Sequence, residues 1–178
     1  TEELLEKAFQ SLTRAAAIAR SDPSVYEGLA RVRIARLDLA RSQGRPAEAI
    51  LARAEDYCRQ ALAADPGRAS TFVLRADLYT FWADFLRDTG KEEGPALERS
   101  NEAAREAIRL DPANTDAYTV YGRNLWRIAL NRMARGQDAG PLLERAAEQL
   151  RKAQACDPNN VTVYNNLVRG HAAAYRAI

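Results

Sequence analysis

The residue types that most often carry catalysis are scarce in this chain of 178 residues. His171 is its one histidine, so we expect neither a His-based metal cluster nor a His-based catalytic triad. The chain also lacks a phosphate-binding loop of the form G-x-x-x-x-G-K-S/T or G-x-G-x-x-G. Carboxylates are plentiful, as at Glu92 and Glu93, but such residues are more often solvated or cap a helix. We therefore expect a protein that is not an enzyme and that holds neither a metal nor a cofactor.

The charge of the chain argues against two classes of partner. The 26 Lys and Arg residues nearly balance the 24 Asp and Glu residues, for a net charge of +2. Such a balance gives no strong field to recruit nucleic acid or an anionic membrane. Neither a long apolar run nor a signal peptide is present in the chain. We expect a cytoplasmic protein with no nucleic-acid partner and no membrane insertion.

An internal repeat of 46 residues decides the expected fold. Gly44, Gly90 and Gly136 are 46 residues apart. The same spacing relates four aromatic residues, which are Tyr26, Phe72, Tyr118 and Tyr164. Asp-Pro pairs mark the repeats as well, at residues 22–23, 65–66, 111–112 and 157–158. Agreement among this many positions indicates a repeated structural unit.

Each repeat has the pattern of two helices joined by a glycine-containing turn. Tyr118, Gly122 and Leu125 share one face at helical spacing, and Gly136 suits the left-handed end of a helix. Each second helix ends at an Asp-Pro pair, because proline disfavours a helical conformation in the residue before it. We predict an all-α solenoid of antiparallel helix pairs, without strands. The predicted pairs are 23–43 with 46–64, 68–89 with 95–110, and 114–135 with 141–156, flanked by single helices at 2–20 and 160–178.

The two cysteines fit this arrangement as free thiols. A disulfide needs Cα atoms within about 7 Å of each other. Cys58 and Cys156 are separated by two full repeats of the predicted solenoid, so we expect no bond between them.

These residues resemble the tetratricopeptide repeat (TPR), in which an early aromatic residue is followed by a small residue, alanines and a closing proline. The third repeat supplies Tyr118, Gly122, Ala146, Ala153 and Pro158. The resemblance covers nearly the whole chain and implies a right-handed superhelix. The TPR period is 34 residues, so a period of 46 implies elongated helices. We expect one array over residues 1–178, with full repeats at 23–64, 68–110 and 114–156, half-repeats at 2–20 and 160–178, and further repeats in a longer protein.

Residues 135–146 read Arg-Gly-x-x-x-x-Pro-Leu-Leu-Glu-Arg-Ala. With this phrase, the long repeats are also similar to the repeat regions attached to bacterial serine/threonine protein kinases. No kinase motif occurs in this chain, since Asp84-Phe85 is followed by Leu86 instead of glycine. This resemblance implies that the chain is a regulatory or substrate-recruiting module of a kinase, or of another enzyme, located outside it.

The TPR resemblance implies a binding groove on the concave face, which the first helix of each repeat lines. The expected groove residues are Glu27, Arg31, Asp77, Phe81, Thr119, Arg123, Trp126, Arg127, Asn165 and Arg169. Arg and Trp are common where binding energy concentrates, and Arg binds carboxylates through paired hydrogen bonds. Two alternatives remain open: the arginines pair within the chain, for instance Arg123 with Asp77, and the tryptophans pack between repeats.

The leading hypothesis is a non-catalytic scaffold that binds a protein or peptide. The carboxylate-clamp form of TPR domains needs a Lys, Asn, Asn, Lys, Arg set, and corresponding positions such as Glu27, Leu74 and Val120 do not match it. An α-solenoid that binds nucleic acid is a third hypothesis, which the near-neutral charge disfavours. Apolar faces on the end helices make self-association a further expectation.

Overall fold

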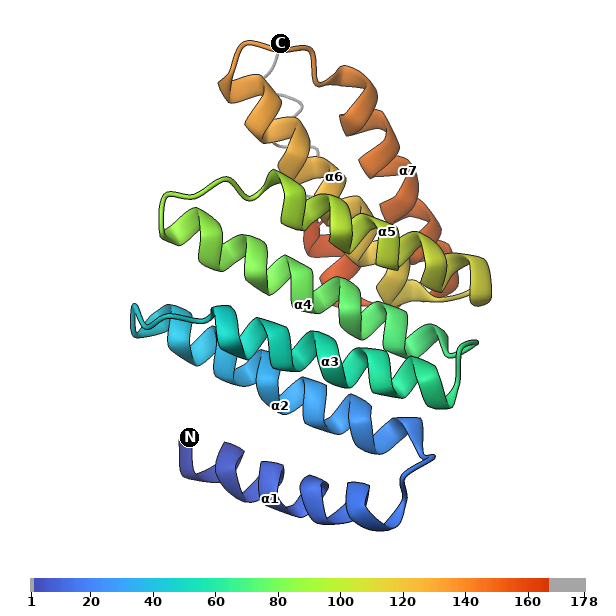
Figure 1. The fold of residues 1–178 in the computed structure, drawn as a ribbon. Coiled ribbons are helices and arrows are strands. Elements are labelled where there is room, and N and C mark those ends of the chain that lie inside the picture. The colour runs from blue at the N-terminus through green and yellow to red at the C-terminus, as the bar shows by residue number, and fades with distance from the viewer. Residues whose placement is uncertain (1, 167–178) are drawn as a thin grey trace.

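The structure is a computed structural model that describes residues 2–166 of the chain. This part of the chain is a stack of antiparallel α-helices, which Figure 1 shows running from α1 at one end to α6 and α7 at the other. No strand occurs within it. The helices are α1 (Glu2–Ile18), α2 (Pro23–Ser42), α3 (Glu48–Ala64), α4 (Ala69–Asp88), α5 (Gly94–Leu110), α6 (Thr115–Ala134) and α7 (Gly140–Cys156), and residues 161–166 are also helical.

The helices follow the 46-residue period of the sequence. The first helices of the repeats, α2, α4 and α6, each span 20 residues and begin at Pro23, Ala69 and Thr115. The second helices, α3, α5 and α7, each span 17 residues. Helix α1 has the same length and lies 46 residues before α3, so it is also a second helix. The predicted all-α solenoid of antiparallel pairs is confirmed, with boundaries within two residues of those expected.

The turn after each first helix has one geometry in all three repeats. Gly44, Gly90 and Gly136 have φ angles of 63°, 71° and 69°, which are left-handed values that glycine adopts without steric cost. The residue after each glycine donates its backbone N–H to a carbonyl five residues earlier, as from Arg45 to Ala40 at 2.9 Å. This is the Schellman helix ending. It reverses the chain and places the second helix against the first.

Apolar clusters join neighbouring repeats. One cluster contains Leu37 of α2, Cys58 of α3 and Leu78 of α4, and Trp82 stacks on Phe85 beside it at 4.9 Å between ring centroids. Both cysteines are free thiols, as predicted, and burial raises the pKa of Cys58 to about 12. Because each cluster spans adjacent units, a repeat buries its apolar side only by stacking on its neighbours.

A buried polar network also links the second and third repeats. Asn124 of α6 donates to the Ser100 hydroxyl of α5 at 2.7 Å, and Ser100 donates to the Ala76 carbonyl of α4 at 2.7 Å. The Thr80 hydroxyl lies 3.4 Å from the side-chain oxygen of Asn124. Hydrogen bonding of these buried groups avoids the cost of an unsatisfied polar atom.

Within a repeat, the two helices pack closely where a small residue on one helix faces a large residue on the other. A Cβ atom added to Gly122 would lie 2.7 Å from Leu150 Cγ and 3.1 Å from the Ala146 carbonyl oxygen. The same position holds Ala76 in the second repeat, and there the position of Leu150 holds Ala104. A small residue on one helix thus accommodates a large residue on the other.

We expect Gly122→Ala to lower the free energy of unfolding by about 1 to 2 kcal/mol. Alanine has the higher helix propensity, but the overpacking against Leu150 and Ala146 destabilises the helix pair by more than this propensity stabilises it. Adding Leu150→Ala should reveal a favourable coupling of about 1 kcal/mol or more in urea denaturation. The control is Gly28→Ala, where the added methyl group meets only the movable ends of the Leu12 side chain. Equal losses for Gly122→Ala and Gly28→Ala would contradict the prediction.

Candidate functional site

A cavity of about 640 Å³ lies along the two neighbouring first helices α4 and α6. We call it the α4–α6 groove. Its position follows from the stacking, because successive first helices lie side by side on one face of the array. Its lining residues are Asp77, Thr80, Phe81, Asp84 and Arg87 of α4, Glu93, then Arg123, Trp126, Arg127, Leu130 and Asn131 of α6, and Asn166.

The apolar part of the groove is held by the core beneath it. Phe81 packs against the cluster shared by α2, α3 and α4, and Trp126 packs against the cluster shared by α4 to α7. Phe81, Trp126 and Leu130 are all half-buried, so each leaves part of its surface in the groove. An apolar partner side chain would therefore meet a wall that is already in place.

Arg127 is neutralised within the chain. Its guanidinium lies 2.9 Å from Asp84 Oδ1 and also pairs with Glu93 Oε2. Asn131 donates to the other oxygen of Glu93 at 2.7 Å. The sequence left open whether Arg127 binds an acidic partner or pairs within the chain. The structure shows pairing within the chain, so its guanidinium is already engaged by Asp84 and Glu93.

Asp77 and Arg123 are a second pair, at the other end of the groove. Arg123 Nη2 lies 3.9 Å from Asp77 Oδ1, which is long for a hydrogen-bonded ion pair. Burial raises the pKa of Asp77, an effect that Arg123 opposes. Burial likewise lowers the pKa of Arg123, against the attraction of Asp77. Neither charge is fully compensated by the other.

Several buried nitrogens at the groove have no hydrogen-bond acceptor within residues 2–166. They are Nε of Arg123, Nε of Arg127, Nε1 of Trp126 and Nδ2 of Asn166. An unpaired buried donor costs about 1 to 3 kcal/mol. The four residues that carry these nitrogens all line the groove, so residues 2–166 supply too few acceptors for the donors gathered there.

The structure separates the ten residues predicted for the groove into two sets. Five of them come together there, namely Asp77, Phe81, Arg123, Trp126 and Arg127. Arg31 and Asn165 are exposed on first helices outside this cavity, and Arg169 lies outside the described residues.

The other two predicted residues make contacts within the array. Glu27 is buried and accepts hydrogen bonds from Arg68, Ser70 and Thr71 at the start of α4. Thr119 is buried and donates to the Thr115 carbonyl of its own helix at 2.7 Å. Both lie near the start of a first helix and not beside the cavity. We therefore leave Glu27 and Thr119 out of the groove.

Sequence reasoning found Asp77 but missed the other two carboxylates of the groove, Asp84 and Glu93. Asp84 follows Asp77 by two helical turns, and that spacing could have placed it on the same face. Glu93 lies in the turn before α5, and no sequence signal points from there into the groove.

Metal and membrane sites were searched over the same part of the chain. No group of three His, Cys, Asp or Glu residues within residues 2–166 is arranged to hold a metal ion. None of the helices described there combines the length and the apolar character needed to cross a membrane.

No protein-family model matches the chain, and no curated protein matches it in sequence. Among solved structures, the first TPR of Spaghetti (RPAP3), bound to the HSP90 peptide SRMEEVD, is similar over 82% of this chain and 93% of that one. Its TM-score is 0.52 and its sequence identity 20%. This likeness and the repeat geometry decide the fold. The chain has a TPR-like repeat fold.

Two further solved structures resemble the TPR-like array more weakly. YrrB, a TPR protein with an unusual peptide-binding site, has a TM-score of 0.34 at 18% identity over 94% of this chain and 86% of its own. Human IFIT1, solved as a dimer with PPP-AAAA, has a TM-score of 0.47 at 14% identity. It covers 96% of this chain, which spans 43% of IFIT1. The expectation that the array has no nucleic-acid partner stays a prediction, and so does its resemblance to kinase-attached repeats.

Proposed function

We propose that the TPR-like array is a non-catalytic protein-interaction scaffold that binds a peptide, or an extended segment of a partner protein, in the α4–α6 groove. The observation that carries the proposal is the groove itself, where half-buried Phe81, Trp126 and Leu130 lie beside buried donors that find no acceptor among residues 2–166. Apolar walls with a few polar groups are typical of ligand sites. The TPR of RPAP3, which has the same fold, is bound to a peptide.

The chemistry of the groove favours a partner segment with an apolar anchor. An aromatic or aliphatic side chain would bury surface against Phe81 and Trp126. Residues 2–166 supply no acceptor for Nε of Arg123 or Nε1 of Trp126. The backbone carbonyls of an extended segment would supply one, after a small side-chain movement that exposes these nitrogens.

The groove disfavours a strongly acidic tail. Asp77, Asp84 and Glu93 balance the three arginines that line the cavity, Arg87, Arg123 and Arg127. A partner carboxylate would have to displace an internal carboxylate from Arg127. We therefore propose a recognition mode different from a carboxylate clamp, which the residues at the clamp positions also fail to supply. The hypothesis that the chain is a module of a kinase or of another enzyme stays a prediction, because no contact within residues 2–166 tests it.

The test uses short random peptides selected on the array from a display library. In a Trp82→Phe background, Trp126 is the one remaining tryptophan and reports on the groove by its fluorescence. We expect selected peptides to shift this emission. Phe81→Ala should weaken their binding by about 30-fold, which corresponds to about 2 kcal/mol from the loss of a groove anchor.

The matched control is Glu102→Ala, which changes an exposed residue of the second helix α5. It should leave the affinity unchanged, and circular dichroism should show that both variants are folded. Peptides that bind Phe81→Ala and the parent protein equally would remove the groove from the proposal.

A further inference from the structure

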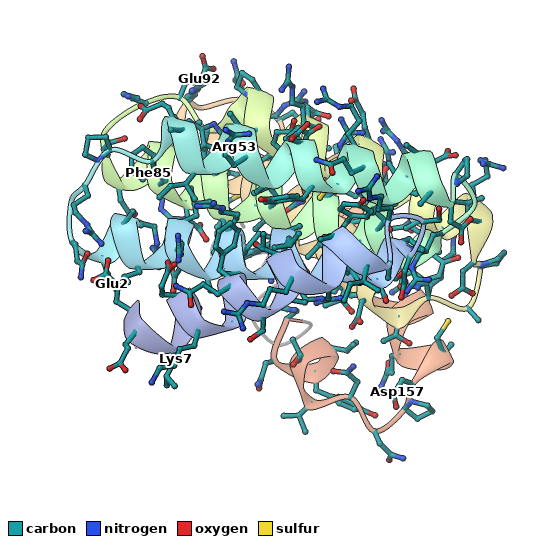
Figure 2. All side chains as sticks on the ribbon, turned by 60° about the horizontal axis from the view of Figure 1, so that its bottom comes forward. Glu2, Lys7, Arg53, Phe85, Glu92 and Asp157 are labelled. Atoms are coloured by element: carbon teal, nitrogen blue, oxygen red, sulfur yellow. The ribbon has the colours of Figure 1, made fainter. Side chains whose placement is uncertain are left out.

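A second cavity, of about 570 Å³, lies where α4 and α6 end, beside the turn that leads into α5. We call it the basic cavity. Its charged lining consists of the cations Arg87, Lys91, Arg132 and Arg135 and the carboxylates Glu92 and Glu93. Four cations and two carboxylates leave a surplus of two positive charges, whereas the α4–α6 groove is lined by equal numbers of each. Figure 2 shows Glu92 at the outer edge of the molecule, on the turn between α4 and α5.

Ion pairs within the array account for only part of this positive charge. Arg87 lies 3.2 Å from Asp84, and Lys91 pairs with a carboxylate of α3 at 3.5 Å. Arg132 and Arg135 are exposed, and neither forms an ion pair with a carboxylate of residues 2–166. Two guanidinium groups at the cavity are therefore available to an anion.

The repeat itself does not require cations at these two positions. A basic residue near the end of a helix ordinarily interacts with the negative pole of the helix dipole. The equivalent of Arg132 at the end of α4 is Leu86, however, and the equivalent of Arg135 is Thr89. The end of α6 is also capped without them, because the backbone N–H of Gln137 donates to the Arg132 carbonyl at 3.0 Å. The positive surplus is thus a property of the cavity and not of the helix ending.

The basic cavity adjoins the α4–α6 groove. Three residues line both, namely Arg87, Glu93 and Asn131. Along α6, Arg132 follows the groove residue Trp126 by about 9 Å at helical rise, and Arg135 follows it by about 14 Å. An extended segment advances about 3.3 Å per residue, so about three or four residues would lead from the apolar wall of the groove to these arginines.

We propose that the partner segment in the α4–α6 groove carries a phosphorylated serine or threonine, three or four residues from its apolar anchor, and that this phosphate binds in the basic cavity. The inference rests on the proposed binding of a segment in the groove. A phosphorylated side chain carries about 1.5 to 2 negative charges at pH 7, which matches the surplus of two. Its three outer oxygens can accept from both Arg132 and Arg135. A single carboxylate would offset one of the two charges.

A library of synthetic peptides, with one central phosphoserine and mixed residues elsewhere, tests the proposal on the full chain. Retained peptides should be enriched in an apolar residue three or four positions from the phosphoserine. Replacing the phosphoserine with serine should weaken binding by about tenfold or more, measured by the fluorescence anisotropy of labelled peptides. Arg132→Gln combined with Arg135→Gln should remove this difference and leave the affinity of the serine peptides unchanged.

The matched control removes two arginines at a distance from the cavity. Arg53 of α3, labelled in Figure 2, and Arg151 of α7 are both exposed on second helices. Arg53→Gln combined with Arg151→Gln changes the net charge by the same amount and should keep the preference for phosphoserine. Circular dichroism should show that both double variants are folded. An equal loss of the preference in the two double variants would mean attraction by overall charge alone and would overturn the proposal.

Further outcomes separate this inference from the groove beneath it. Serine peptides that need Phe81 but gain nothing from phosphorylation would overturn the inference and leave the groove intact. Phosphopeptides that bind Phe81→Ala as tightly as the parent protein would overturn both. Glutamate peptides that bind as tightly as phosphoserine peptides would show that the cavity recognises acidic side chains instead. A uridine oligonucleotide that bound more tightly than the phosphopeptides, through the same two arginines, would assign the cavity to nucleic acid and overturn the proposal.

Discussion

Replacing Arg127 with leucine is expected to lower the free energy of unfolding by about 3 to 5 kcal/mol, the usual cost of removing one partner from a buried ion pair. The side chain of Arg127 is 12% exposed and that of Glu93 is 9% exposed, so little water replaces the lost charge. Asp84 would lose its Arg127 partner too. Urea denaturation at neutral pH measures the effect.

The matched control is Arg132→Leu on the same helix. Arg132 is exposed and forms no ion pair within residues 2–166, so its loss should change stability by less than about 0.5 kcal/mol. The triple variant Arg127→Leu, Asp84→Asn, Glu93→Gln should regain most of the loss, since it leaves no uncompensated buried charge, and Arg87, which also pairs with Asp84, is 51% exposed. If Arg127→Leu proved as stable as Arg132→Leu, internal pairing would not be what holds this end of the groove.

Replacing Glu27 with alanine is expected to cost about 2 to 4 kcal/mol at neutral pH. Its carboxylate is 8% exposed and accepts from Arg68 Nε at 2.9 Å, Ser70 Oγ at 2.7 Å and Thr71 Oγ1 at 2.6 Å. The loss leaves the fully buried Thr71 hydroxyl without this acceptor. Because the contact joins the first and second repeats, thermal unfolding should also become less cooperative.

The control for this variant is Glu106→Ala, which removes the acceptor of an exposed pair with Arg109 and should lower stability far less than Glu27→Ala does. A pH series adds a second readout. Burial alone would raise the pKa of Glu27, but hydrogen bonds from Arg68, Thr71 and Ser70 outweigh it and lower the pKa below its usual value near 4.5. The stabilisation is thus present above pH 4.5 and is lost as pH falls through the lowered value.

The difference between the parent protein and Glu27→Gln should therefore be constant from neutral pH down to about 4.5 and shrink below it. A difference that stays the same at lower pH would mean that the ionised carboxylate is not the stabilising form.

The period predicted the backbone well because backbone geometry depends on local signals. Gly44, Gly90 and Gly136 mark turns that share one hydrogen-bond pattern, and the Asp-Pro pairs mark the helix ends. The 46-residue spacing also predicted which residues of the first helices share one face. Five of the residues expected on that face line the α4–α6 groove.

Side-chain pairing was not predictable, because it joins residues far apart in the sequence. Arg127 pairs with Glu93, which is 34 residues away, and neither position repeats in the other units. Glu27 shares a phase with Thr119 near the start of a first helix, where the structure uses both side chains inside the array. The position of a residue within the repeat predicts which way its side chain points. It does not predict which other residues of the array the side chain contacts there.

The two interfaces between complete repeats are secured by different polar groups on nearly identical backbones. The first uses Glu27 with Arg68 and Thr71, and the second uses the buried network that contains Thr80 and Asn124. An exchange of repeats would join groups that do not match, such as a carboxylate with no donor to meet it. These contacts therefore specify the order of the units, which disfavours out-of-register pairing of the repeats during folding.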